Sequence, residues 1–195
     1  ARALAAKYRT DLAHGEQVAE FGERLFDELQ TEHQLDGSHR FLLRIASLLH
    51  EIGLFVGNRG HHKHSLYLIL NSDLFGLTRD DILLVALVAR YHRRNSPSPL
   101  HPEYASLPRE RRLMVQKLAA ILRVADALAR ARRPRLPEIA IARDENRLTL
   151  TLNSLDDVSL ERMALVEKGG LFTDIYGLEI ALRTTPLLKG PESNV

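Results

Sequence analysis

Residues 47–53, with the sequence Ser-Leu-Leu-His-Glu-Ile-Gly, decide the fold, because two ionisable side chains stand there in an apolar helical run. Leu43, Ala46 and His50 follow one another at helical spacing, so the His50 imidazole continues a stripe that should face the core. A buried imidazole beside a carboxylate needs partners, because unpaired polar groups are costly away from water. The stretch therefore predicts a helix whose His50 and Glu51 are either hydrogen-bonded within the protein or part of a site for a metal or a charged ligand.

The composition limits the classes of protein that fit the chain. Its 195 residues are enough for one hydrophobic core with a small appendage. No apolar run approaches the roughly 20 residues that cross a bilayer, and the start of the chain lacks the apolar segment of a signal peptide. Because the chain has no cysteine, a bound metal must be held by His, Asp, Glu and water. We expect no membrane and a cytoplasmic protein. Since the chain does not begin with Met, we also expect a domain cut from a longer protein.

Arginine clusters are the main feature of the charge pattern. The formal net charge is only +2, but basic residues gather at 90–94, 109–112 and 130–135. The planar guanidinium forms paired, charge-assisted hydrogen bonds with phosphate, so such clusters suit a phosphate-rich ligand. For any single cluster, a solvated helix face is the simpler explanation.

The apolar periodicity changes along the chain, from helical spacing before Pro134 to alternation after it. We expect helices over residues 11–32, 38–51, 61–71, 78–92 and 108–132, then a β-hairpin within 139–152, a helix over 155–168 and a strand over 178–183. The prediction is a mainly α fold. A helical bundle domain would occupy residues 1–134, and a small β-β-α-β appendage with a C-terminal tail would occupy residues 135–195.

Ionisable side chains lie on otherwise apolar faces of four separate helices: His14, His50, His92 and Asp126. Taken singly, each has a structural explanation, such as a hydrogen bond to a carbonyl, a helix cap or an ion pair with an arginine. A helical bundle, however, brings inward positions together, which is how metal sites in bundles are built. Imidazole and carboxylate without thiolate suit a divalent cation such as Mn, Fe, Co, Ni or Zn. No glycine-rich phosphate loop stands between a strand and a helix, so we expect no organic cofactor.

The order His14, His50-Glu51, Asp126 on successive helices resembles the HD-domain superfamily of helical, metal-dependent phosphohydrolases. A closer resemblance is carried by four segments: Leu-His-Glu-Ile-Gly at 49–53, His-Lys-His-Ser-Leu-Tyr-Leu-Ile at 62–69, Asn-Ser-Asp-Leu at 71–74 and Ala-Arg-Tyr-His-Arg at 89–93. In this order they are similar to the C-terminal, HD-like region of Ppx/GppA exopolyphosphatases and guanosine pentaphosphate phosphohydrolases. The similarity covers nearly the whole chain.

This resemblance implies an accessory domain. In that family the phosphohydrolase site lies in N-terminal actin-like domains, and nothing in this chain matches them. The implied partners are therefore those N-terminal domains, together with polyphosphate or a phosphorylated guanosine nucleotide, and a homodimer is left open. One departure concerns Glu51, which stands where the superfamily has Asp. The longer side chain moves the carboxylate outward, so we expect weaker or altered metal binding.

The resemblance also implies roles for individual residues. His14, His50 and Asp126 would hold a divalent cation (Mn, Fe, Co, Ni, Zn or Mg), while Glu51 would be a further ligand or a catalytic group that orients water. A second cation or phosphoryl oxygens would be bound by His62, His64, His92, Arg93, Arg94 and Arg123.

Three functions remain in competition. We favour the accessory domain of a Ppx/GppA-type exopolyphosphatase. The alternatives are an independently active, metal-dependent HD phosphohydrolase and a non-catalytic module for polyphosphate binding or dimerisation. A nucleic-acid regulator has the least support, because the sequence offers neither a reading helix nor an aromatic platform.

Overall fold

The computed structural model describes residues 1–93, 95–134, 137–154 and 156–185. Its helical part begins with four helices, α1 (Arg2–Lys7), α2 (Leu12–Glu28), α3 (Gln30–His33) and α4 (Gly37–Leu49). The 3-10 helix η1 (Ile52–Phe55) leads into α5 (His61–Leu70), α6 (Arg79–Arg90), α7 (Pro102–Ala105) and the long helix α8 (Arg109–Leu128). The helices expected from the sequence are confirmed, with the first one divided into α2 and α3.

Side-chain caps fix where the main helices begin. Asp11 accepts a hydrogen bond from the His14 amide (3.0 Å) at the start of α2, and Asp36 accepts one from the Ser38 amide (2.9 Å) at the start of α4. Thr78 forms a reciprocal capping box with Asp81 at the start of α6. These caps satisfy amides that have no partner inside a helix, so the sequence determines the first turn of α2, α4 and α6 locally.

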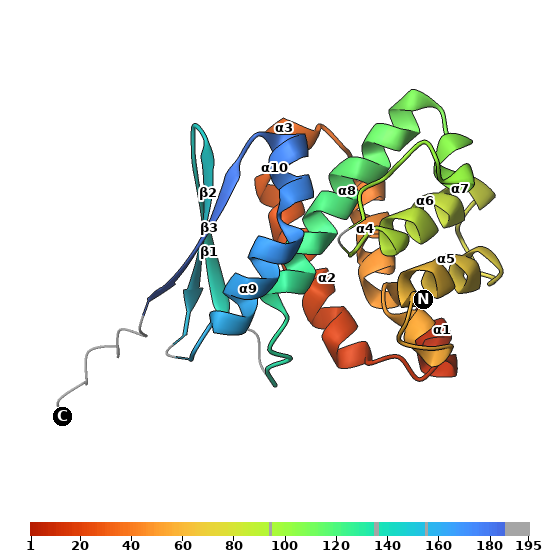
Figure 1. Cartoon of the computed structure of the whole chain (residues 1–195), viewed down its shortest axis with the longest axis horizontal. Helices are drawn as coiled ribbons and strands as arrows, with labels where there is room; N and C mark the ends of the chain where they lie inside the picture. Colours follow the sequence, from red (N-terminus) through yellow and green to blue (C-terminus); the bar gives the residue numbers. More distant parts are fainter. Residues whose placement is uncertain (94, 135–136, 155, 186–195) are drawn as a thin grey trace.

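The core of the helical part forms around α8, which contacts α2, α4 and α6. The apolar stripe of α2 is buried, with Val18, Phe21 and Leu25 each at most 1 % exposed. In Figure 1, α8 crosses the middle of the molecule, with α4 to α7 on one side of it. No helix in the described part of the chain is both long enough and apolar enough to cross a membrane.

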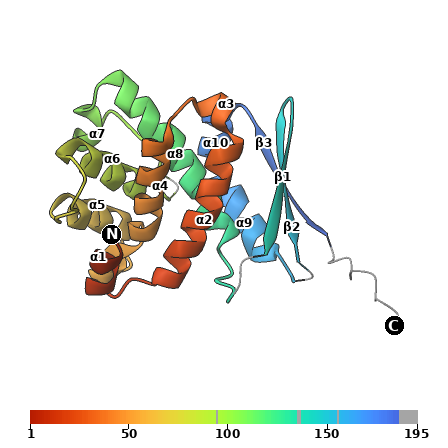
Figure 2. The ribbon, with the colours of Figure 1, turned by 180° about the vertical axis from the view of Figure 1, so that it is seen from behind.

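A three-stranded sheet lies at the opposite end of the molecule from α5 to α7 (Figures 1 and 2). Strands β1 (Glu138–Asp144) and β2 (Arg147–Asn153) form the predicted antiparallel hairpin. Strand β3 (Glu179–Thr185) pairs with β2 in parallel, in the order β1-β2-β3. Parallel neighbours need a crossover connection, which here is formed by α9 (Ser159–Lys168) and α10 (Gly170–Tyr176).

The second crossover helix differs from the predicted β-β-α-β order, which has one helix at this place. Gly169 ends α9 and immediately precedes α10, with φ −71° and ψ −17°. A Cβ at this position would lie 2.7 Å from the Leu165 carbonyl oxygen, so a glycine is needed where the two helices join closely. The adjacent glycines predict the end of a helix, but here a second helix starts directly after the first.

Helices α9 and α10 lie between α8 and the sheet in both views and contact α8. They belong to the C-terminal side of the predicted division at residues 134 and 135, yet they pack against a helix on its N-terminal side. The division into a helical domain and an appendage stays a prediction.

Candidate metal site

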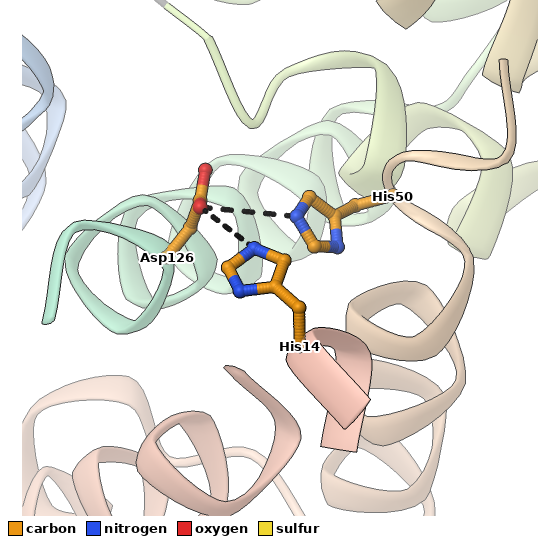
Figure 3. Close-up of side chains that lie close together, drawn as sticks. All are labelled: His14, His50 and Asp126. Carbon is orange, nitrogen blue, oxygen red and sulfur yellow. Dashed lines mark ion pairs between the residues drawn. The ribbon is translucent and has the colours of Figure 1, made fainter. Parts of the chain in front are cut away.

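Three buried side chains from α2, from the end of α4 and from α8 converge at the centre of the helical part (Figure 3). The Nε2 atom of His14 lies 3.5 Å from Oδ1 of Asp126, and Nε2 of His50 lies 3.8 Å from the same oxygen. The three potential ligand atoms all lie within 4.8 Å of one another. The structure thus brings together His14, His50 and Asp126, as the helical spacing predicts.

Close packing of α2 against α4 places the two imidazoles. A Cβ at Gly15 would lie 3.3 Å from the backbone of Leu48, so the glycine next to His14 lets the two helices approach beside the site. His14 itself stands in the first turn of α2, which Asp11 caps. His50 follows directly on the last residue of α4, within the same helical conformation (φ −61°, ψ −31°). Both imidazoles are therefore positioned by the ends of helices rather than by flexible loops.

The His50 ring is held through one nitrogen and leaves the other free. Its Nδ1 atom lies 2.6 Å from the Ser47 carbonyl oxygen, to which it can only donate. The Nε2 atom of neutral His50 therefore carries a lone pair, and it faces Asp126. A metal-binding histidine is usually oriented by this kind of second hydrogen bond.

Several buried atoms of the site have no hydrogen-bond partner among the described residues: both ring nitrogens of His14 and Nε2 of His50. Burial lowers the pKa of His50, which keeps it in the neutral form that binds a metal. Burial opposes ionisation of Asp126, but contacts with His14 and Lys168 outweigh it and hold the pKa of this carboxyl well below its usual range. The site therefore presents two imidazoles and one carboxylate, a donor set that fits a divalent cation.

Lys168 is a residue of the site that sequence analysis missed. It is the last residue of α9, and its ammonium forms an ion pair with Oδ2 of Asp126. The side chain of Lys168 is 11 % exposed. A lysine at the end of a helix is typical of a solvated cap, so no pattern within the sequence pointed to this contact.

Glu51 lies at the edge of the cluster. Its Oε2 is 4.0 Å from Nε2 of His14 and only 2.7 Å from a guanidinium nitrogen of Arg132. Arg132 also binds the capping carboxylate of Asp11 at 2.6 Å. Burial raises the pKa of Glu51, but His50 and Arg132 more than compensate, so the pKa is lowered overall. The geometry makes Arg132 a further site residue, and the roles of Glu51 as ligand or catalytic group stay predictions.

His92 extends the site toward α5, with a partner other than the expected ones. Its Nδ1 lies 2.6 Å from the Ala89 carbonyl oxygen, and its Nε2 lies 3.0 Å from Nε2 of His61. The ring centres of His50 and His92 are 5.1 Å apart. The sequence predicts His62 and His64 as partners of His92, but the structure brings His61 to this position. Helical spacing puts His61 on the same face of α5 as His64, and this shared face is the pattern in the sequence that hints at His61.

The remaining predicted residues lie around this group without joining it. His62 is half-buried, and burial together with nearby cations such as Arg93 lowers its pKa to about 4. His64 is also half-buried on α5, and Arg93 is exposed. Arg94 lies outside the described residues. Binding of a second cation or of phosphate by these residues stays a prediction.

Arg123 is placed differently from what a phosphate contact requires. It is 2 % exposed, and its guanidinium donates to the carbonyl oxygens of Tyr91 (2.7 Å) and Asn95 (2.6 Å). Burial lowers its pKa to about 10. Two main-chain acceptors therefore already use this side chain, which ties α8 to the segment after α6.

Comparison with known proteins relates this site to a family. Residues 1–169 match the family model described as Ppx/GppA phosphatase, domain III. The chain belongs to the Ppx/GppA family. It is also 31 % identical over 181 residues to the guanosine-5'-triphosphate,3'-diphosphate pyrophosphatase of Vibrio atlanticus (strain LGP32). This match covers 89 % of the chain but 35 % of the relative, so the chain spans about a third of the relative's length.

The family match confirms the resemblance on which the predicted identity was based. The chain is a C-terminal, accessory Ppx/GppA domain in a family of phosphohydrolases, and it carries a buried His/Asp group. Much of the Vibrio relative lies beyond the matched segment, so a Ppx/GppA protein of that length has further domains.

Proposed function

We propose that this Ppx/GppA domain binds a divalent cation through His14, His50 and Asp126. As an accessory domain it would help a phosphohydrolase to engage polyphosphate or a guanosine nucleotide that carries several phosphates. The observation that carries the proposal is the convergence of three buried ligand atoms, two of them imidazole nitrogens without hydrogen-bond partners among the described residues. Buried polar atoms in native proteins are nearly always satisfied, so unpaired ones at a common centre point to an absent ligand.

The donor set limits which cation fits. Two imidazole nitrogens and one carboxylate oxygen suit Mn, Fe, Co, Ni or Zn better than Mg, which prefers oxygen ligands. When bound, such a cation lowers the pKa of coordinated water and neutralises charge on a phosphoryl group. In this proposal Glu51, which pairs with Arg132, would orient that water, and the exposed Arg93 would bind a phosphate oxygen. His92 with His61 takes the role assigned from the sequence to His62, His64 and His92.

The partner in this proposal is the remainder of a longer Ppx/GppA protein, with the hydrolytic centre in N-terminal actin-like domains. The pyrophosphatase name of the Vibrio relative supports a guanosine nucleotide as substrate of such a protein. Hydrolysis of polyphosphate, the reaction of an exopolyphosphatase, is the alternative activity within the same family.

Metal titration tests the proposed site. Isothermal titration of the metal-free chain with Mn²⁺ should show one binding event, and metal analysis after dialysis should find one equivalent. The variants His50→Ala and Asp126→Asn should weaken binding by more than about 100-fold, since even the loss of an outer-shell partner costs about 10- to 100-fold. The matched control is His39→Ala, because His39 stands at the other end of α4 and binds Asp36. If the wild-type chain binds neither Mn²⁺ nor Ni²⁺, the proposal is wrong.

One observation favours a second candidate function. Lys168 already pairs with Asp126, as expected if the group were a metal-free polar core and the domain a binding module for polyphosphate. In that case polyphosphate binding should fall steeply with salt concentration and should be unaffected by a chelator. A cation-dependent affinity for polyphosphate would rule out this candidate.

A further inference from the structure

We infer that Lys168 competes with the divalent cation for Asp126, because its ammonium pairs with that carboxylate until a metal displaces it. The inference rests on the proposed function and names how the chain itself controls that site. It assigns a role to a residue that belongs neither to the helices carrying the ligands nor to the residues expected from the sequence.

The contacts of Asp126 divide its two oxygens between the imidazoles and an ammonium. Oδ1 faces Nε2 of His14 and Nε2 of His50, whereas Oδ2 pairs with the ammonium of Lys168. The observed cationic partner of the carboxylate is the ammonium of Lys168. In the absence of a metal, the ammonium therefore balances the charge of a carboxylate that is 4 % exposed. A buried carboxylate without a partner would be strongly destabilising, which explains why α9 places a lysine here.

A divalent cation and the Lys168 ammonium cannot both bind the Asp126 carboxylate strongly at the same time. Both would lie within a few ångströms of each other in an interior where charges are poorly screened, and like charges at that distance repel strongly. The cation gains two imidazole nitrogens as ligands in addition to Oδ1 of Asp126, whereas the ammonium pairs with Oδ2 of that carboxylate. A metal that binds His14, His50 and Asp126 must therefore weaken or break the Lys168 contact.

This competition couples the metal site to the C-terminal part of the chain. Lys168 is the last residue of α9 and directly precedes the Gly169–Gly170 junction with α10, and both helices pack on α8. The ion pair thus holds the end of α9 against α8 in the metal-free protein. Metal binding would release that end while the apolar contacts of α9 and α10 remain.

The test compares the whole chain with the variant Lys168→Met, which keeps the length of the side chain and removes its charge. Mn²⁺ affinity measured by isothermal titration should rise at least tenfold in Lys168→Met. In chelator, the same variant should melt about 5 °C or more below the wild type, because Asp126 loses its partner, and saturating Mn²⁺ should abolish that difference. Lys168→Gln provides a polar second variant and should also bind Mn²⁺ more tightly.

Lys117→Met is the matched control, because Lys117 lies on α8 and its ammonium binds the His33 carbonyl oxygen outside the site. It removes the same charge and should leave Mn²⁺ affinity within twofold of wild type. If the wild type binds Mn²⁺ and neither Lys168 variant binds it more tightly, the inference is overturned while the proposed metal site stands. If the wild type binds Mn²⁺ and both Lys168 variants bind it at least tenfold more tightly, the inference is supported. Absence of binding in all of them overturns both proposals.

Discussion

The His50 imidazole is anchored at Nδ1 by the Ser47 carbonyl and is open at Nε2. His92 repeats the arrangement, with its Nδ1 against the Ala89 carbonyl at 2.6 Å. In both cases the carbonyl stands three residues earlier, at the end of a helix, where the main-chain oxygens lack helical partners. A histidine at the end of a helix thus donates to a main-chain carbonyl of the last turn and directs its second nitrogen into the core. This local geometry places two imidazole nitrogens in the core without needing any particular loop.

The buried histidines should make the metal-free protein sensitive to mild acid. Burial lowers the pKa of His50 and holds the pKa of His92 well below its ordinary value of 6.5. Both side chains are then neutral in the folded protein but protonated in the unfolded chain below about pH 6.5, so the unfolded state binds more protons. The free energy of unfolding should therefore fall by about 1 kcal/mol per pH unit for each histidine as the pH drops below that value.

Urea denaturation in chelator at pH 7.5 and at pH 5.5 measures this effect. The variant His92→Gln removes one of the histidines with a lowered pKa and should reduce the pH dependence. The control is Gly57→Ala, which adds a methyl group in open space, removes no titratable group and should leave the dependence unchanged. Equal stability of the wild type at both pH values would contradict the prediction.

At the scale of elements, the turn after α4 connects His50 with the pair formed by His61 and His92. Ser65 of α5 donates from its hydroxyl to the His50 carbonyl (2.8 Å) and accepts from the Gly53 amide (3.0 Å). A Cβ at Gly53 would lie 2.1 Å from the His61 carbonyl oxygen and 2.5 Å from the Ser65 amide nitrogen. Only glycine allows η1 and α5 to approach this closely, and the approach brings His61 near His92.

Substitution of Gly53 should therefore lower the stability of the protein and disturb the contact between His61 and His92. Gly53→Ala forces η1 away from α5 and should cost about 3 kcal/mol or more, since overpacking of a rigid backbone contact cannot be relieved by a rotamer change. Gly57→Ala is the matched control, because a Cβ at Gly57 meets no atom within 4 Å. Thermal unfolding measures the difference, and a Gly53→Ala variant as stable as Gly57→Ala would contradict the close approach.

The sequence predicted the site where the ligands lie on regular elements. His14 and Asp126 could be assigned because their helices have long apolar stripes that determine which side faces inward. His61 and Lys168 could not be assigned with the same reasoning. The position of His61 depends on the turn between η1 and α5, and that of Lys168 on how α9 crosses α8. Both are long-range features of packing, which helical spacing alone does not contain. Helix α10 was missed because two adjacent glycines usually mark the end of a helix.

At the scale of the whole molecule, the packing of α9 and α10 on α8 makes the C-terminal part a support of the helical core. Phe172 of α10 is fully buried and Leu171 is 5 % exposed. Glu161 of α9 is also buried and pairs with Arg133, just after α8. Beyond these contacts, α9 supplies the cation that balances Asp126.

A chain that ends at residue 134 should therefore fold poorly. It exposes the face of α8 that α9 and α10 cover, and it leaves Asp126 buried without Lys168, which should cost about 3–5 kcal/mol in addition to the lost apolar contacts. Circular dichroism and size-exclusion chromatography should show lower helicity and aggregation relative to the full chain. Addition of Mn²⁺ should restore part of the helicity, since a cation replaces the missing ammonium. A stable, monomeric fragment without metal would instead establish residues 1–134 as an independent domain.

The parallel pairing of β2 with β3 sets an order on how the protein reaches its native state. The β1–β2 hairpin joins neighbouring residues and can form early, whereas β3 can pair only after the α9–α10 crossover has found its place. Lys168 lies within that crossover, so its ammonium reaches Asp126 in the same late step. Until then the Asp126 carboxylate lacks its ammonium partner. A newly made chain would therefore pass through a stage at which the site is most open to a metal from its surroundings.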